Sequence, residues 1–399
     1  MKKILFVAEA VSLAHVARPS ILADSISGLD YEIVFASNGN FEICSKNIEC
    51  EKFLLNSIST ELFMRRLAAG RPVYSEQELV AYVEADLRML KSVRPSAVVG
   101  DFRLTLAIAA RLSGVPLFSI CNAYWSPFAD DQQMQAPDLP IANMIGFSTF
   151  DKIFRLTWPV ASWYHCTAIN RVRCRYGFSP YRSLRDYYCD GDFTMYADTP
   201  GLVPTVNLPS SHGYIGPIVW SPSIPLPEWW AQALAQPGPR AYITLGSTGS
   251  VELLPAIVSA CLDEGLICLV ATAGRSDFKA PSHKVFAAPF LPGSAAAAAA
   301  NLVICNGGSP TAYQALEAGR PVLGICSNLD QVLSMKGIRR ADSGLFMRAG
   351  ECSRALLHAS ISTLLREPSF LSNAKNVQKE FNAMNAKKNF PSLIERELS

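Results

Sequence analysis

A chain of 399 residues is long enough to form two domains, each with a core of its own. Hydrophobic residues make up 49% of the sequence and charged residues 18%, a composition that excludes an intrinsically disordered protein. The net charge is +2, from 36 basic and 34 acidic side chains, so composition implies neither a nucleic-acid partner nor an anionic-membrane partner.

The cysteines and the first residues bear on the compartment. Eleven cysteines are scattered without CxxC pairs or histidine clusters, which favours reduced thiols over a disulfide framework or a zinc site. The opening MKKILFVAEAVSLA superficially resembles a signal peptide, but Glu9 interrupts its apolar run, and we interpret it as a buried strand. No apolar run reaches about eighteen residues, so we expect a cytoplasmic protein without stable membrane insertion.

The first half alternates short apolar runs with helical patterns, as a doubly wound parallel sheet does. Strands are predicted at Lys3–Ala8, Tyr31–Ala36, Ala97–Val99, Val115–Ile120 and Phe193–Ala197. Helices are predicted at Val16–Ile26, Ser57–Ala69, Glu76–Val93 and Thr105–Leu112, with a turn at Ser12–His15.

A stretch rich in proline, serine and glycine, residues 201–225, is the best candidate for a domain linker. The strand pattern then restarts at Ala241–Leu245, Ile267–Ala271, Val285–Phe286, Leu302–Cys305 and Pro321–Ile325, with helices at Leu253–Leu262, Ala295–Ala300, Pro310–Ala318 and Leu371–Phe381. We therefore expect an α/β protein with a first domain at 1–200, a second at 226–370 and a final helical segment at 371–399.

Two glycine-rich turns of the second half each join a strand to the start of a helix. One comprises Gly246, Ser247 and Thr248; the other runs from Asn306 through Gly307, Gly308 and Ser309 to Thr311, with Ser309 as the expected N-cap. Backbone N–H groups and the helix dipole at such turns favour phosphate oxygens, although many similar turns bind nothing. Two such turns in one half indicate a phosphate site more strongly than either alone.

Polar side chains also follow other strands. Asp330 and Gln331 suit hydrogen bonds to sugar hydroxyls, or they belong to a solvated loop. His15 follows the first strand and Asp101 a later one, and the carboxyl ends of parallel strands share one edge of the sheet. The two could form a general base with its orienting carboxylate, or serve as helix caps, and the residues alone leave both possibilities open.

Aromatic residues are dense between residues 121 and 190. Most of them suit helices that pack on the sheet, and Tyr124, Trp125 and Phe128 lie nearest the expected edge. These three are candidates for an apolar acceptor pocket over His15.

The stretch from Asn301 to Gln331 resembles the donor-binding signature of the nucleotide-sugar-dependent glycosyltransferases with the GT-B fold. It keeps the family's residues at Gly307, Gly308, Thr311, Gly319, Pro321, Asp330 and Gln331. It departs at Asn306, where the family has a phosphate-binding histidine, at Pro310, usually glycine, and at Gln314, usually a glutamate that faces the ribose.

The resemblance extends along nearly the full chain. Ala14-His15 stands where the family carries its base in a Gly-His motif, and Asp101-Phe102 matches its Asp-Phe motif. Phe290 matches the aromatic residue that stacks on the nucleobase, but Gly293 replaces a glutamine there, so uridine and thymidine both stay open. The family fold is two Rossmann-like doubly wound domains that face each other across a cleft, with the last helix crossing back to the first domain.

The resemblance implies metal-independent, inverting transfer of a sugar from a UDP- or dTDP-sugar to a hydroxyl or amine of a small-molecule acceptor. His15 would take the acceptor proton and Asp101 would orient it. The nucleotide sugar is a co-substrate, and no cofactor is implied. Donor contacts are expected from Gly246, Ser247, Thr248, Phe290, Asn306, Gly307, Gly308, Ser309, Thr311, Gln314, Asp330 and Gln331.

Two alternatives remain. A sugar-nucleotide epimerase of the same fold would need further acid and base carboxylates, and the sequence shows no clear set. A non-catalytic nucleotide-sugar-binding protein would carry replacements such as Asn306, Pro310 and Gln314, although an intact His15–Asp101 pair argues against a decayed site. The sequence does not specify the sugar, the acceptor or the oligomeric state.

Overall fold

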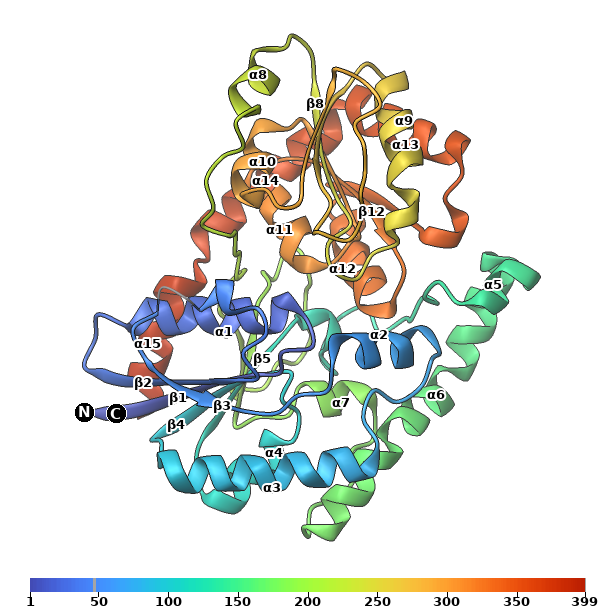
Figure 1. Ribbon diagram of the computed structural model, residues 1–399. Helices are drawn as coiled ribbons and strands as arrows, with labels where there is room; N and C mark the ends of the chain where they lie inside the picture. Colours follow the sequence, from blue (N-terminus) through green and yellow to red (C-terminus); the bar gives the residue numbers. More distant parts are fainter. Residues whose placement is uncertain (46–47, 399) are drawn as a thin grey trace. The chain divides into compact units, whose positions relative to one another are not determined.

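The computed structural model describes residues 1–45 and 48–398, and the chain divides into two compact units (Figure 1). The first unit comprises Met1–Gln133, Leu156–Ile218 and Met384–Ser399. The second unit comprises Met134–Arg155 and Val219–Ala383, so it includes a short segment from the first half of the chain.

The first unit is built on a seven-stranded parallel sheet with the order β3-β2-β1-β4-β5-β6-β7. Its strands are β1 (Lys2–Ala8), β2 (Tyr31–Ser37), β3 (Glu51–Leu54), β4 (Ala97–Asp101), β5 (Leu117–Cys121), β6 (Phe193–Tyr196) and β7 (His212–Tyr214). Residues 4–8 are wholly buried, which explains the unbroken apolar run: parallel strands are covered on both faces.

Helices cover both faces of this sheet. Its helices are α1 (Leu13–Ile26), α2 (Thr60–Ala68), α3 (Glu76–Val93), α4 (Leu106–Ser113), α7 (Leu184–Tyr188), α15 (Ala386–Leu398) and most of α6 (Phe147–Arg175), with 3₁₀ turns η1 (Glu42–Cys44) and η2 (Ala123–Trp125). In Figure 1, α1 and α15 lie together on one face, and α3 and α4 on the other. The chain ends also meet, because the Lys2 ammonium donates to the Leu398 carbonyl.

The second unit repeats this architecture with a six-stranded parallel sheet in the order β10-β9-β8-β11-β12-β13. Its strands are β8 (Arg240–Thr244), β9 (Ile267–Ala271), β10 (Val285–Ala288), β11 (Leu302–Cys305), β12 (Val322–Cys326) and β13 (Gly344–Arg348). The helices are α5 (Pro140–Ile145), α8 (Trp230–Ala235), α9 (Leu254–Asp263), α10 (Gly293–Ala299), α11 (Ser309–Glu317), α12 (Leu329–Arg340), α13 (Arg354–Arg366) and α14 (Pro368–Ala383), with η3 (Val251–Leu253) and η4 (Ala349–Glu351).

Both sheets contain a point where the strand order reverses. In the first unit the reversal lies between β1 and β4, where Ala8 is paired with Asp101. In the second it lies between β8 and β11, where Thr244 is paired with Cys305. Ligands of open parallel sheets bind outside the carboxyl ends of the strands at such points. The predicted class, two Rossmann-like doubly wound units, is confirmed.

The structure differs from the prediction in several elements. Helix α1 begins at Leu13 and not at Val16, so the predicted turn at Ser12–His15 is wrong. Proline favours the first turn of a helix, which led the prediction to start too late; Pro19 instead lies in the second turn and lacks the N–H that would bond to the His15 carbonyl. The sequence also missed the short strands β3, β7 and β13, because few alternating apolar residues mark them.

Two observations bear on the compartment and the membrane. All eleven cysteines, each of which the structure describes, carry free thiols. Over residues 1–45 and 48–398, no helix combines the length and the apolar character that a bilayer span requires.

A buried ionic cluster stabilises the segment that follows β4. The Arg103 guanidinium donates to the Glu9 carboxylate at 2.8 Å and to the Asp86 carboxylate at 3.0 Å, and all three side chains are inaccessible to solvent. Thr105 donates to the other Asp86 oxygen, and Tyr82 to the other Glu9 oxygen. These bonds fix the backbone immediately after Asp101.

We predict that Arg103→Ala lowers the free energy of unfolding of the first unit by about 3–5 kcal/mol, because two buried carboxylates lose their counter-charge. Denaturant-induced unfolding measures the loss, with Arg88→Ala on the exposed side of α3 as the control. A loss for Arg103→Ala no larger than that of the control would contradict the role of the cluster.

Candidate functional site

The structure brings His15 and Asp101 together at the reversal point of the first sheet. His15 lies in the first turn of α1, and Asp101 is the last residue of β4. The His15 Nδ1 atom lies 2.8 Å from Asp101 Oδ1, and 18% of the histidine side chain is exposed against none of the carboxylate. Because Nδ1 donates to the carboxylate, the neutral ring leaves the Nε2 lone pair available, and no described residue bonds to it.

Arg18, one helical turn after His15, is a member of this group that the sequence did not reveal. Its Nε and Nη2 atoms donate to Asp101 Oδ2 and Oδ1, each at 2.7 Å. Burial alone would lower the pKa of the guanidinium, but the Asp101 carboxylate outweighs this and raises it, so Arg18 stays charged. The spacing of three residues between His15 and Arg18 on one helix was the available signal.

Arg18 also connects this group to a second buried carboxylate. Its Nη1 atom donates to Asn122 Oδ1 at 2.7 Å, and Asn122 Nδ2 donates to Asp198 Oδ1 at 3.1 Å. The Asp198 carboxylate in turn accepts from the Ala123 backbone N–H, which begins η2. The guanidinium therefore bonds directly to groups at the ends of β4 and β5, and through Asn122 to the carboxylate that follows β6.

An aromatic stack supports the histidine ring. Phe102 lies parallel to His15 with ring centroids 4.4 Å apart, and Phe63 of α2 meets Phe102 edge-on at 5.9 Å. Phe102 has a φ of +57°, a left-handed conformation that costs a non-glycine residue of the order of 1–3 kcal/mol. Strain of this kind beside a polar constellation is typical of a functional site.

The three residues predicted for the acceptor lie in and after η2. Tyr124 and Trp125 are buried, and Trp125 reaches the stack through Tyr188, which lies 4.8 Å from Trp125 and 5.5 Å from Phe102. Phe128 instead contacts His212 of β7 at 5.2 Å. Trp125 is therefore the member of the predicted set that is linked to His15 through ring contacts.

In the second unit, the two glycine-rich turns follow β8 and β11, on either side of the reversal point. Thr248 of the first turn accepts hydrogen bonds at Oγ1 from Asn306 Nδ2 at 3.0 Å and from Gln331 Nε2 at 3.1 Å. Both amides are oriented by backbone donors, since Asn306 Oδ1 accepts from Gly308 and Gln331 Oε1 from Ser327. Both acceptor positions of the Thr248 hydroxyl are thus filled, and its O–H is left to donate.

Glycines shape both turns. Gly246 and Gly307 have φ values of +59° and +78°, and a Cβ at Gly307 would lie 2.7 Å from Cys326 Sγ. The N-cap of α11 is Gly308, so the prediction that Ser309 caps this helix is wrong by one residue. Ser309 is buried in the first turn, while Gly308, Thr311 and Ser247 are half-buried.

Asp330 and Gln331 lie in the first turn of α12, not in a loop. Gln331 is buried and forms a capping box with Asn328, because its Oε1 accepts from the Ser327 and Asn328 N–H groups. Both the oxygen and the nitrogen of the Gln331 side-chain amide are therefore hydrogen-bonded within the protein. The Asp330 side chain is exposed.

Phe290 and Gln314 complete the predicted donor residues. Phe290 is 55% exposed, as a platform for a flat ring would be. Gln314 is buried, and its Nε2 donates to the Trp220 carbonyl at 2.6 Å. A Cβ at Gly293 would lie 2.3 Å from Gln314 Oε1, so glycine at 293 is what makes room for this glutamine.

Arg275, in the loop after β9, is a further cation at the first turn that the sequence analysis missed. Its Nη1 atom donates to the carbonyls of Gly246 at 3.1 Å and Gly249 at 2.8 Å. Its partners are backbone atoms, which no sequence pattern identifies.

The two constellations differ in chemistry. The first unit presents an oriented imidazole nitrogen that can accept a proton. The second presents backbone N–H groups, a helix N-terminus and an O–H that can all donate to an anion.

No family model matches the chain. It is 38% identical over 398 residues to a PGL/p-HBAD biosynthesis glycosyltransferase of Mycobacterium tuberculosis (strain ATCC 25177 / H37Ra), covering 100% of this chain and 92% of that protein. It is 42% identical over 348 residues to a PGL/p-HBAD biosynthesis rhamnosyltransferase of Mycobacterium bovis (strain BCG / Pasteur 1173P2), covering 87% of this chain and 77% of that protein.

Among solved structures, the spinosyn rhamnosyltransferase SpnG complexed with thymidine diphosphate has a similar fold. The two align with a TM-score of 0.69 at 18% identity, over 100% of each chain. The fold and the two relatives together show that the chain belongs to the nucleotide-sugar-dependent glycosyltransferases of the GT-B fold, the family that its motifs resemble.

Proposed function

We propose that this glycosyltransferase uses His15 as the general base and the turns after β8 and β11 as the diphosphate site. The observation that carries the proposal is the His15–Asp101 hydrogen bond of 2.8 Å at the reversal point of the first sheet, with Nε2 left for a substrate. The reaction is transfer of a sugar, with inversion, to a hydroxyl or amine of a small-molecule acceptor.

In the first unit, His15 Nε2 takes the acceptor proton as the acceptor oxygen or nitrogen attacks the anomeric carbon. Asp101 holds the Nδ1 hydrogen and stabilises the imidazolium that forms. Arg18 is a positioning residue that fixes both carboxylate oxygens. Phe102 stacks on the His15 ring, and Trp125, which is linked to it through Tyr188, is the proposed apolar contact of the acceptor nearest this ring. Tyr124 and Phe128 are proposed as further acceptor contacts.

In the second unit, negative charge grows on the leaving diphosphate and needs donors. Thr248 supplies its O–H, and the first turn of α11 supplies the backbone N–H groups of Ser309 and Thr311. Ser247, Ser309 and Thr311 add hydroxyls. Asn306 and Gln331 act by orienting Thr248, and the exposed carboxylate of Asp330 binds the sugar hydroxyls.

For the donor, a dTDP-sugar is favoured over a UDP-sugar. SpnG is solved with thymidine diphosphate, and the relative of M. bovis is named a rhamnosyltransferase. Phe290 is the proposed platform for the base, and Gln314, whose amide is bonded to the Trp220 carbonyl, is the proposed neighbour of the ribose. The acceptor is proposed to resemble those of PGL/p-HBAD biosynthesis.

We expect His15→Ala to reduce sugar transfer by about a hundredfold to ten-thousandfold, because no base remains to take the proton of the attacking hydroxyl or amine. Binding of dTDP and UDP stays at the wild-type level, since His15 belongs to the first unit. Transfer from dTDP- and UDP-sugars is measured by product formation, and nucleotide binding by calorimetry.

The same assay separates the alternatives. A wild-type protein that binds a nucleotide sugar without consuming it would be a non-catalytic binding protein, and one that interconverts free nucleotide sugars would be an epimerase. Unchanged turnover in His15→Ala would remove this residue from the mechanism.

The role of Arg18 is tested by a double-mutant comparison. Arg18→Met is expected to lower kcat about tenfold to a hundredfold, because Asp101 and the imidazole lose their fixed geometry. In a His15→Ala background the same change costs less than about threefold, since Arg18 acts through that ring. Equal losses in both backgrounds, with parallel falls in unfolding midpoint, would assign Arg18 a purely structural role.

Thr248 provides the corresponding test of the second unit. Thr248→Val removes the free O–H and the shared acceptor of two amides, and should weaken nucleoside diphosphate binding by about tenfold or more. Thr248→Ser keeps the hydroxyl and should bind nearly as the wild type does. If the serine and valine variants bind alike, the hydroxyl is not a phosphate donor.

A further inference from the structure

One face of α6 in the first unit is apolar and open to solvent. Leu156, Val160, Trp163 and Tyr164 are 84%, 67%, 63% and 46% exposed. Their spacing of four, three and one residues places them on the same side of the helix. Four large apolar side chains in one stripe, here called the α6 stripe, are unusual on a protein surface that nothing covers.

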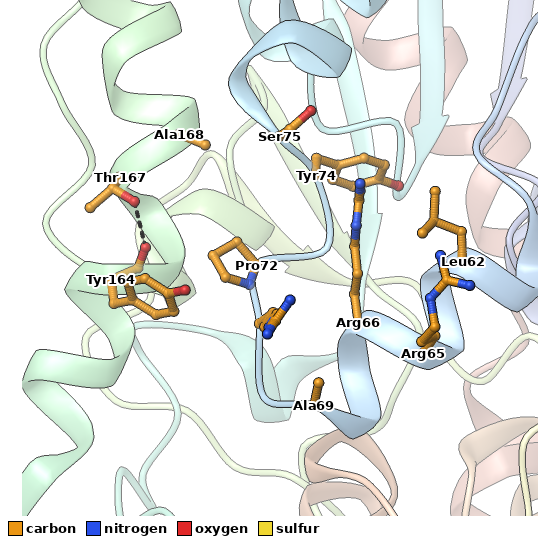
Figure 2. Close-up of a pocket in the computed structure, with 11 residues that line it drawn as sticks. Leu62, Arg65, Arg66, Ala69, Pro72, Tyr74, Ser75, Tyr164, Thr167 and Ala168 are labelled. Carbon is orange, nitrogen blue, oxygen red and sulfur yellow. Dashed lines mark hydrogen bonds between the residues drawn. The ribbon is translucent and has the colours of Figure 1, made fainter.

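A cavity of about 650 Å³ adjoins the α6 stripe. Figure 2 shows Leu62 and Arg65 of α2 on one side of it and Tyr164 and Thr167 of α6 on the other, with Pro72 between them. Tyr164 belongs to both the stripe and the cavity wall, so the two surfaces are continuous.

The cavity is lined by three arginines, of which one has a carboxylate partner. Arg66 is paired with Glu78 at 2.7 Å. Arg65 and Arg71 are exposed and form no ion pair with any residue that the structure describes. Two guanidinium groups therefore border the cavity with their donors unused, and such groups bind phosphate oxygens well.

We propose that the α6 stripe and the Arg65–Arg71 cavity dock the protein on an anionic phospholipid bilayer, with a lipid phosphate in the cavity. Leucine and valine would enter the acyl boundary, while Trp163 and Tyr164 lie at the headgroup level that tryptophan and tyrosine favour. The arginines match the negative surface charge of the lipid.

The charge distribution also argues against a second copy of the chain. A two-fold contact through the stripe would bring like-charged arginines of both copies close together, and four side chains fall short of the roughly 800 Å² per partner of a stable interface. The overall net charge of +2 does not oppose membrane docking, because it sums over the whole chain and the attraction acts within about a Debye length of this face.

This inference goes beyond the proposed function, because lipid binding requires neither donor nor acceptor. The test is flotation of the full chain with vesicles of phosphatidylcholine alone or with roughly one third phosphatidylglycerol. We expect binding to the anionic vesicles, weakened by salt. Replacing Leu156, Val160 and Trp163 by serine should reduce it by at least about tenfold, and Arg65→Gln with Arg71→Gln by about twentyfold.

Matched controls leave the surface intact. Leu112→Ser changes an exposed leucine of α4, and Arg88→Gln with Lys91→Gln removes the same charge from α3. Both should bind as the wild type does. Failure of the wild type to float with anionic vesicles, or full binding by the stripe variant, overturns the proposal. A wild-type protein that is dimeric in solution, with a stripe variant that is monomeric, also overturns it.

Sugar transfer to a water-soluble acceptor is measured for the same variants and is expected to be unchanged. A protein that transfers sugar but ignores vesicles would disprove the docking surface alone. A protein that floats but does not transfer would disprove the proposed function alone.

Discussion

The parallel pairing of β1 with β4 determines where the polar groups of the first unit can meet. It places the carboxylate of Asp101, wholly buried, beside the start of α1, where a lone negative charge would be very costly. Two bonds from Arg18 and one from His15 compensate that charge. The imidazole is thus oriented by the same bonds that make the buried carboxylate tolerable, so stability and proposed chemistry depend on a single set of contacts.

The second unit uses the same topology with a different kind of polar group. Its reversal point holds no buried ion pair around the turns; neutral amides of Asn306 and Gln331 converge on the hydroxyl of Thr248 within the described residues. An incoming diphosphate therefore meets aligned dipoles and the Arg275 guanidinium, which contacts the first turn through backbone carbonyls, without having to displace a bound carboxylate. The difference between the units follows from side chains at equivalent strand ends and not from the fold.

Much of this could be predicted because it is encoded locally. Buried parallel strands are unbroken apolar runs, and the turns after β8 and β11 carry their glycines in sequence. The partnership of Arg18 with Asp101 spans 83 residues, and that of Thr248 with Gln331 spans 83 as well. Such bonds depend on strand order, which periodicity does not specify. Gln331 shows the consequence: the sequence suggested a sugar contact, while its amide caps α12 and orients Thr248.

The residues that depart from the family pattern make specific contacts with their neighbours. Gly293 and Gln314 stand where the family has glutamine and glutamate, and the missing Cβ at 293 is what lets Gln314 reach the Trp220 carbonyl. Asn306, in place of histidine, bonds to both Gly308 and Thr248. A site that had lost its function would accumulate replacements independently of one another. These replacements instead form specific contacts and leave the Thr248 O–H able to donate, which argues for a remodelled donor site over a decayed one.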